Sequence, residues 1–499
     1  MDRGIGHSVA AAGQARFRQD AAAAAILLAL AALLVGPSLA ATPMTHDSFW
    51  IDYVWAKQFS GELARGEIYP RWLPDSFSGL GAPVFYFYPP LAFYAVALFD
   101  LGGASTYDAL LIAFGAFFFL SGWGGYLLFR GQGLRPLAAA AFLVVAPYHL
   151  MDFHLRGALA ESAAIAILPF LAMGIRTMRE SGRWHGAAIA YAMLIMSHLP
   201  MALLASLFMI APAFVLHRDA RRPLVLATIA GLGLAAIYLV PALALGSFRD
   251  EAQLYIEARL NPGYWGVIAA HWDDQFVVIM HCLVASIALP VALLWWKERD
   301  RRLLYCLVVC GFALVLVPYF WSLPLIAKVQ FPFRVLPFAE LALAAYVAHS
   351  KLDPRLLVLA LLPSLVAGWL VFHLPTDRPA TLAQLDRVMP DVAEVLPPGT
   401  IDYDLEVSEY PDFREGRVPP PKREGGVILE PTFYFPIWSC GERDPATGLL
   451  ARPAGCTPTR VRNPAELWGI AISILSLLTL LGRGLVQRRR RPKSKLAAA

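Results

Sequence analysis

The chain has 499 residues, of which 58% are apolar and only 16% charged, and its formal net charge is +5. Because soluble domains carry about 25% charged residues, this composition excludes an ordinary water-soluble protein. The positive charge does not indicate nucleic-acid binding, since the basic residues lie in short clusters between apolar runs.

Apolar runs of membrane-spanning type recur along the chain. We predict spans at residues 21–40, 108–129, 137–151, 158–176, 186–198, 200–217, 223–246, 276–296, 303–322, 335–350, 355–373 and 467–482. Placing every basic cluster between them in the cytoplasm gives strict in–out alternation over these spans. The sequence therefore predicts a polytopic α-helical protein of the bacterial inner membrane with about 12 transmembrane helices. Its N-terminus (1–20) and its basic tail (483–499) are then both cytoplasmic.

Two apolar segments each fit more than one kind of membrane segment. Residues 84–100 are apolar, but a span there would move Arg130 and Arg135 outside, so we expect a helix that lies in the outer interface or re-enters from it. The stretch SLAAT at 38–42 resembles a signal-peptidase site. Since the preceding apolar run is long for a signal peptide, we expect an uncleaved anchor.

The alternation places the polar segments that can carry chemistry outside. The multi-span domain 21–373 has a long first outer loop at 41–107, and the tail 374–466 contains strand-like runs that predict a small β-rich extracytoplasmic domain. Cys440 and Cys456 lie in that tail, where an oxidising compartment favours a disulfide.

The first outer loop opens with THDSFWIDY, which contains His46 and Asp47. An aspartate at the water–lipid boundary can accept a proton from a hydroxyl group or bind a divalent cation, and the histidine can share that task. The pattern fits a helix N-cap equally well. Arg71, in YPRW, can clamp a phosphate or extend to the lipid headgroups.

Later outer segments supply further candidates. Arg156 and Glu161 lie in PYHLMDFHLRGALAES, where ionisable groups at membrane depth are either paired or functional. Gln330 and Arg334, in KVQFPFRVLPF, suit a phosphate-bearing ligand or an interface anchor. His198, in SHLP, either stabilises a tight turn or faces the same compartment. Motifs for ATP-driven transport and serine hydrolysis do not occur in a suitable context.

The outer-loop motifs together resemble a known family. THDSFW, IYPRWLPD, GLGAPVFYFYPPL, RGALAES, SHLP and QFPFR, over roughly residues 20–373, are similar to bacterial and archaeal membrane proteins labelled as bearing a 6-pyruvoyl-tetrahydropterin-synthase-related domain. The zinc-binding histidine triad that this label suggests is not present.

More distantly, the layout is similar to the GT-C superfamily of glycosyltransferases, which use polyprenyl-phosphate or polyprenyl-diphosphate sugar donors. This resemblance implies that Asp47 occupies the place of their first-loop acidic residue and that Arg71, Arg156 or Arg334 holds the carrier phosphate. The acidic residue here follows His46 instead of forming an Asp-Glu pair. A requirement for Mg²⁺ or Mn²⁺ therefore stays open.

The leading hypothesis is a glycosyltransferase that takes a sugar from a polyprenyl-phosphate-linked donor in the bilayer to a glycan or lipid acceptor at the outer face. Asp47 and His46 are its expected catalytic residues. Its expected substrate-binding residues are Arg71, Arg156, Glu161, His198, Gln330 and Arg334. A transporter or flippase of lipid-linked glycans and a non-catalytic envelope assembly protein are the alternatives.

Overall fold

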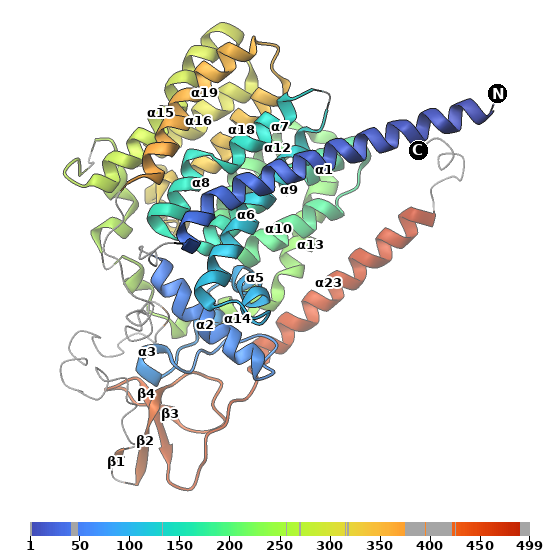
Figure 1. Cartoon of the computed structure of the whole chain (residues 1–499). Helices are drawn as coiled ribbons and strands as arrows, with labels where there is room; N and C mark the ends of the chain where they lie inside the picture. The colour runs from blue at the N-terminus through green and yellow to red at the C-terminus, as the bar shows by residue number, and fades with distance from the viewer. Residues whose placement is uncertain are drawn as a thin grey trace. The chain divides into compact units, whose positions relative to one another are not determined.

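The computed structural model describes residues 2–40, 48–131, 133–255, 257–268, 271–314, 316, 319–374, 395, 422–424 and 426–489. These residues form mostly helices, with a small sheet near the C-terminus (Figure 1). The chain divides into two compact units that alternate along the sequence. The first unit comprises Met1–Asp47, Leu110–Met173 and Pro262–Pro379, and the second comprises Ser48–Ala109, Gly174–Asn261 and Ala380–Ala499.

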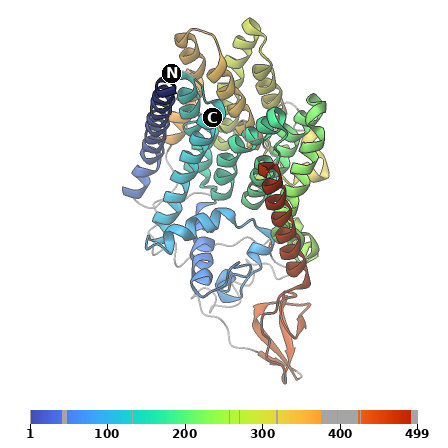
Figure 2. The ribbon, with the colours of Figure 1, turned by 90° about the vertical axis from the view of Figure 1, so that its right-hand side faces the viewer.

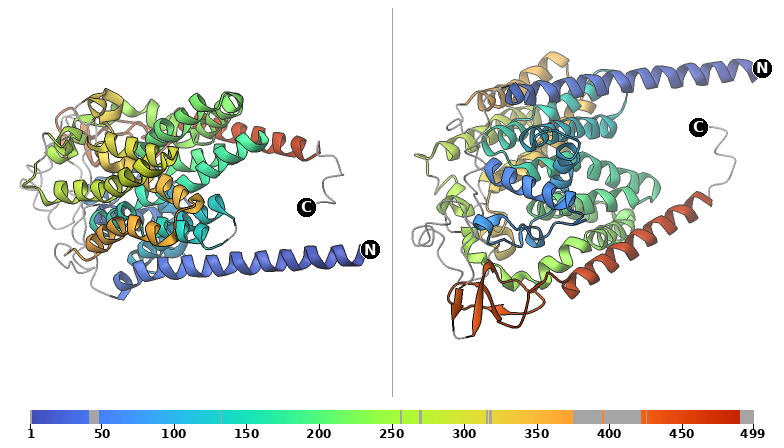
Figure 3. Two further views of the ribbon diagram at one scale, coloured as in Figure 1. Left: turned by 90° about the horizontal axis from the view of Figure 1, so that it is seen from above. Right: turned by 60° about the horizontal axis from the view of Figure 1, so that its bottom comes forward.

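The elements that lie wholly or mainly in the first unit are helical. They are α1 (Asp2–Ala40), α6 (Thr106–Phe129), α7 (Arg135–Val144), α8 (Pro147–Met151), η1 (Asp152–Arg156), α9 (Leu159–Ser181), η7 (Pro262–Trp265), α15 (Gln275–Glu298), α16 (Arg301–Leu314), η8 (Phe320–Ser322), α17 (Pro324–Ala327), η9 (Pro332–Val335), α18 (Leu336–His349) and α19 (Pro354–Phe372). Figure 3 shows α1 as one continuous helix.

The second unit contains shorter helices and the sheet. Its helices are α2 (Phe49–Ala64), α3 (Ser76–Gly79), α4 (Val84–Phe87), α5 (Leu91–Asp100), α10 (His185–Ser197), α11 (Leu199–Ala205), η2 (Ser206–Ile210), α12 (Ala211–Leu216), η3 (Arg218–Ala220), α13 (Arg221–Leu234), α14 (Ala236–Ala244), η4 (Gly246–Phe248), η5 (Glu251–Tyr255), η6 (Ala258–Leu260) and α23 (Pro464–Arg489). Its strands are β1 (Lys422–Glu424), β2 (Val427–Phe433), β3 (Glu442–Arg443) and β4 (Leu449–Pro453).

The described part of the chain contains 8 helices that are long and apolar enough to cross a membrane. They match the predicted spans that begin near residues 21, 108, 137, 158, 200, 276, 355 and 467, so the chain is a multi-pass membrane protein. A ninth predicted span, 223–246, is two helices bent by 69°. Helices α10, α16 and α18 have 13 or 14 residues, about 20 Å at 1.5 Å per residue. The predicted count of twelve is therefore not confirmed.

The apolar segment 84–100 does not form one continuous helix. It consists of α4 and α5, which are separated by Pro89 and Pro90. Because proline has no N–H group to continue a helix, α5 starts afresh after the pair. Its 10 residues are about 15 Å long, half of the hydrocarbon thickness, so α5 alone does not span a bilayer.

The segment PYHLMDFHLR, expected on the outer side, is helical up to Arg156. Pro147 ends the hydrogen-bond ladder of α7 and starts α8, after which residues 152–156 form a π-helical turn. The chain reverses only at Gly157, whose φ of 59° is left-handed. Asp152 and Arg156 therefore lie at a helix end, which fixes the positions of their backbones.

The C-terminal sheet has four antiparallel strands in the order β1-β2-β4-β3 (Figure 2). The register shifts between Glu430 and Phe433, where Pro431 cannot donate to the ladder. The sheet is attached to the segment around Leu80 of the same unit, since Phe433 N and Thr432 Oγ1 both donate to Leu80 O at 2.9 Å. The prediction of a small β-rich segment in the tail is thus supported over residues 422–453.

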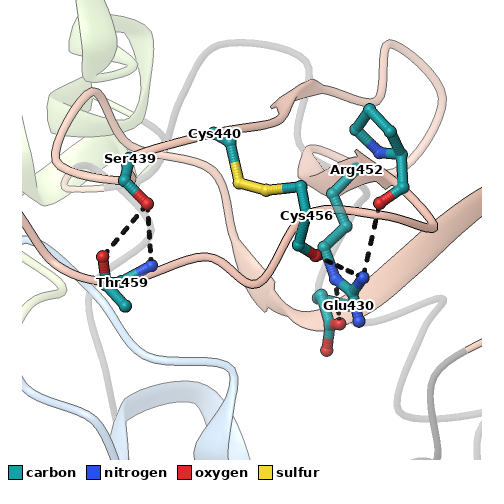
Figure 4. Close-up of a disulfide and its surroundings, with 7 residues drawn as sticks. Glu430, Ser439, Cys440, Arg452, Cys456 and Thr459 are labelled. Atoms are coloured by element: carbon teal, nitrogen blue, oxygen red, sulfur yellow. Dashed lines mark hydrogen bonds and ion pairs between the residues drawn. A yellow bond between two sulfur atoms is a disulfide. The ribbon is translucent and has the colours of Figure 1, made fainter.

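Cys440 and Cys456 form a disulfide beside this sheet (Figure 4). Their Cα atoms are 6.6 Å apart, within the usual range for this bond. Arg452 holds the same turn, donating to Glu430 Oε1 and to Cys456 O. The disulfide therefore closes the loop between Cys440 and Cys456, and Arg452 links the end of this loop to Glu430 of β2.

Removing this disulfide is expected to destabilise the sheet. For a loop of this size the loss is about 3 kcal/mol. Limited proteolysis of purified Cys440→Ser/Cys456→Ser protein should therefore cut within 422–460 faster than in the wild type. Cys282→Ser, which removes a free exposed thiol, is the control, and equal cleavage of all three proteins would show that the bond contributes nothing.

Candidate functional site

Four charged side chains meet in the first unit, and we call them the first-unit ion cluster: Asp152, Arg156, Glu161 and Arg334. Glu161 Oε2 accepts from Arg156 Nη1 at 2.7 Å and from Arg334 Nε at 2.9 Å. Arg156 Nη1 also donates to Asp152 Oδ1 at 2.8 Å. All four residues are at most 6% exposed. Two carboxylates thus neutralise two guanidinium groups that the sequence places far apart.

The local backbone explains how these residues meet. Gly157 N donates to Phe153 O and Ala158 N to Asp152 O, so the helix end closes on itself and α9 starts at once. The turn brings Glu161, in the first turn of α9, back to Arg156. In the segment KVQFPFR, Arg334 Nη1 donates to Val329 O at 2.6 Å. This hydrogen bond joins the two ends of the segment.

Aromatic rings and a third carboxylate, that of Glu340, lie around the cluster. Phe331 lies under both guanidinium groups, with its centroid 5.0 Å from Arg156 Cζ and 4.7 Å from Arg334 Cζ. Tyr148 donates its hydroxyl to Glu161 Oε1. The backbone N–H of Tyr148 donates to Glu340 Oε1 at 2.8 Å. Glu340 therefore caps the helix start that Pro147 creates.

The cluster has hydrogen-bond capacity for an anion. A guanidinium group carries five N–H donors. Among the described residues, hydrogen bonds use only Nη1 of Arg156 and only Nε and Nη1 of Arg334. The remaining N–H groups can bind a phosphate while Glu161 fixes the orientation of both guanidinium planes.

Arg71 occupies a different cluster, in the second unit. Its Nε lies 3.4 Å from Glu466 Oε2, and its Nη2 donates to Ile237 O at 2.7 Å. That carbonyl is free of its helical partner because Pro241, four residues on, has no N–H. Nη1 of Arg71 is buried and has no hydrogen-bond partner in the described structure.

Tyrosines complete the environment of Arg71. Its Cζ lies 3.7 Å from the ring centroid of Tyr69, and Tyr86 donates to Glu466 Oε1 at 2.6 Å. Burial raises the pKa of Tyr69 and of Tyr86 above the usual range, and burial raises the pKa of Tyr94 to about 12. These hydroxyl groups therefore stay protonated near neutral pH and act as donors.

Glu466 links this cluster to the start of α23. It accepts the N–H of Asn463 at 3.0 Å, while Asn463 Oδ1 accepts the N–H of Ala465 at 3.0 Å. This reciprocal pair is a capping box, which the sequence NPAE encodes. Arg71 is thus tied to α23, the helix that follows the sheet.

Glu466→Ala should lower the thermal stability of the protein markedly. The substitution leaves Arg71 buried without its counter-charge, a change that costs about 3–5 kcal/mol. Arg176→Ala is the matched control, because Arg176 and Glu180 are 45% and 64% exposed in their pair. A melting curve in detergent should show a large decrease for the first variant and little for the second. Equal curves would contradict this account of Arg71.

The predicted site residues are distributed as follows. Arg156, Glu161 and Arg334 come together, and Gln330 lies within the segment that Arg334 holds, in a left-handed conformation with φ 66°. Arg71 and His198 belong to the second unit. His198 Nδ1 accepts the N–H of Met201 at 3.3 Å and so caps α11. His46 and Asp47 lie outside the described residues.

Several functional neighbours were not predicted as site residues. Tyr148, Ser162 and Glu466 are embedded in apolar or helix-start patterns that give no reason to select them. Ser162 donates to Asp152 Oδ2 at 3.0 Å. Within the described ranges, no three His, Cys, Asp or Glu side chains are grouped to hold a metal ion.

The chain was compared with known proteins. No protein-family model and no curated protein matches it. Among solved structures, it is similar to an arabinofuranosyltransferase from mycobacteria (TM-score 0.44, 17% identity, covering 71% of this chain and 28% of that one). It is also similar to the Archaeoglobus fulgidus oligosaccharyltransferase in the apo form (TM-score 0.41, 12% identity, 71% and 55%).

A structure of that archaeal enzyme tethered with an acceptor peptide gives a TM-score of 0.42 at 14% identity, covering 84% of this chain and 61% of that one. This chain thus spans less than two thirds of the length of each of these proteins. At such TM-scores the similarity decides neither an activity nor a substrate.

Proposed function

We propose that the protein is a membrane glycosyltransferase that transfers a sugar from a polyprenyl-phosphate-linked donor to a glycan or lipid acceptor at the extracytoplasmic face. The proposal rests on one observation: Arg156 and Arg334 both form ion pairs with the Glu161 carboxylate. Both arginines come from segments predicted to be outside, and both retain N–H groups for a ligand. The layout of the sequence, which resembles that of GT-C glycosyltransferases, supports the same reaction class.

In the proposed reaction, the donor phosphate binds to the unused N–H groups of the two arginines. The acceptor oxygen attacks the anomeric carbon of the sugar, and the bond from that carbon to the phosphate oxygen breaks. The polyprenyl phosphate leaves with the bonding electron pair, and Asp47, assisted by His46, takes the acceptor's proton. Guanidinium groups already oriented by Glu161 stabilise the charge that grows on the leaving phosphate.

Charge balance defines what else the site needs. With all four groups ionised, the first-unit ion cluster is neutral, so a bound phosphodiester adds one uncompensated negative charge. An additional cation would correct this. One source of this positive charge is Lys328, which is exposed and precedes Val329, the residue whose carbonyl accepts from Arg334. Another source is Mg²⁺ or Mn²⁺ bound with Asp47. Transfer that is unaffected by a metal chelator would favour Lys328.

One observation favours the transporter alternative. The span Arg135–Arg156 is interrupted at Pro147, and the buried Glu340, 2% exposed, caps the new helix start. Interrupted helices with buried ionisable groups are typical of substrate sites in secondary transporters. A transporter would move the lipid-linked sugar without breaking its bond to phosphate.

The test separates these two functions. Purified protein in liposomes receives a panel of labelled polyprenyl-phosphate sugars together with envelope glycan and lipid fractions. The proposal expects label in an acceptor and release of polyprenyl phosphate in equal amounts. Movement of the donor between leaflets with no release would establish the transporter instead. Arg302→Lys is the control for variants of Arg156 and Arg334, because Arg302 pairs with Asp300 and is not part of the first-unit ion cluster.

A further inference from the structure

An apolar groove in the second unit lies beside the π-helical turn η2. It has a volume of about 310 Å³. Side chains from η2, α12 and α13 line it, namely Ser206, Ile210, Ala211, Phe214, Val215, Leu224, Val225, Thr228 and Ile229. The two polar residues in this set already use their hydroxyls, because Ser206 donates to Ala202 O and Thr228 to Leu224 O. The groove therefore offers a ligand almost only hydrocarbon contacts.

The helix geometry explains why the groove stays open. Pro212, near the start of α12, has no N–H for the ladder, and the preceding residues widen into a π-helical turn. On its other side α13 packs tightly against α10, where a Cβ on Gly231 would lie 2.8 Å from the Tyr191 ring. Because α13 is packed against α10, it does not move toward η2 and α12, and the groove between them stays open.

Arginines stand at one end of the groove. Arg221 and Arg222 begin α13, and the lining residues Leu224, Val225, Thr228 and Ile229 follow Arg221 at spacings of three, four, seven and eight. Residues at these spacings share one helix face. Arg221 is also held in place, because its Nε donates to Phe214 O at 2.9 Å and its Cζ lies 5.1 Å from the Phe214 ring.

The charge at this end is positive. Arg218 and Arg222 are exposed, Arg221 is half-buried, and Asp219 is the one acidic residue in the stretch 217–223. Three guanidinium groups and one carboxylate leave two net positive charges. The predicted topology puts this end at the cytoplasmic leaflet, where anionic lipids attract basic residues.

We propose that the groove binds one anionic phospholipid. An acyl chain lies along η2, α12 and α13, and the headgroup phosphate binds to Arg221 and Arg222. The paired N–H groups of an arginine match phosphate oxygens geometrically, so the site selects the headgroup as well as the tail. This site is independent of the proposed transfer reaction and uses none of its residues.

Native mass spectrometry of the purified full chain tests this proposal. With phosphatidylglycerol and phosphatidylcholine at equal concentration, one phosphatidylglycerol should remain bound per chain. Arg221→Gln/Arg222→Gln should weaken its binding by at least about 10-fold. Arg299→Gln/Arg301→Gln, which removes two arginines from another basic cluster, should leave binding unchanged.

Further arms distinguish the tail from the headgroup. Val225→Trp, at a residue 44% exposed, fills the groove and should also prevent binding while all arginines remain. Millimolar inorganic phosphate should not displace the lipid, because it has no tail. Equal binding of both phospholipids, equal effects of the two double variants, or displacement by phosphate would each overturn the proposal. Melting curves of every variant show whether a loss of binding is a loss of folding.

Discussion

Glu161→Ala is expected to be among the most destabilising single substitutions in the first unit. It removes the carboxylate shared by Arg156 and Arg334 and leaves Asp152 as the only acidic member of the ion cluster. Uncompensated buried charge costs about 3–5 kcal/mol. The melting temperature in detergent should therefore fall strongly, and the loss should persist in Glu161→Gln, which keeps the size of the side chain but not its charge.

A matched exposed pair provides the control. Glu180 is 64% exposed and lies 3.4 Å from Arg176, a type of pair worth about 0–1 kcal/mol. Glu180→Ala should leave the melting temperature nearly unchanged. If Glu161→Ala and Glu180→Ala behaved alike, the cluster would not hold the two arginines in place, and the proposed phosphate site would lose its structural basis.

Asp47→Asn should reduce sugar transfer by about 10²–10⁴-fold, the usual contribution of a positioned general base. The amide keeps the shape of the side chain but cannot accept the acceptor's proton, so the turnover rate should fall while the KM for the donor stays nearly constant. Asp75→Asn, an exposed aspartate in the same loop, should transfer at the wild-type rate.

The capping alternative for Asp47 makes a different prediction. The structure places Ser48 at the N-cap of α2, with no hydrogen bond from its side chain. If Asp47 only capped that helix, Asp47→Asn would leave both stability and the turnover rate nearly unchanged, because asparagine caps a helix as well as aspartate does, whereas Asp47→Ala would lower stability by roughly 1 kcal/mol. Transfer and melting measured on one preparation decide between these roles.

The membrane architecture was largely predictable because hydrophobic length is a local property. Spans such as 276–296 and 355–373 correspond closely to α15 and α19. The breaks were harder to foresee, since the same apolar run can form one helix or two. Ala235 separates α13 from α14, and Ser473 of α23 helps to hold the break by accepting the N–H of Ile237 at 2.8 Å. Such a partner from a distant helix is not visible in a local pattern.

The site was predictable in part. Unusual charges in apolar surroundings identified Arg156 and Glu161, and the structure pairs them, which is one of the two alternatives that the sequence left open. The pairing of Arg334 with the same carboxylate was not predicted. Their partners were less evident, because Tyr148 and Phe331 look like ordinary apolar packing in the sequence. Arg71 was selected for the same reason as Arg334, yet its partner Glu466 lies 395 positions later in a helix cap. Which acidic residue meets which arginine is a property of the fold.

The most direct measurement is a structure of the protein with a polyprenyl-phosphate sugar bound. We expect the donor phosphate to lie within hydrogen-bond distance of the Arg156 and Arg334 guanidinium groups, with the anomeric carbon open to an acceptor beside Asp47. A donor phosphate that makes no contact with Arg156 and Arg334 would contradict the proposed mechanism.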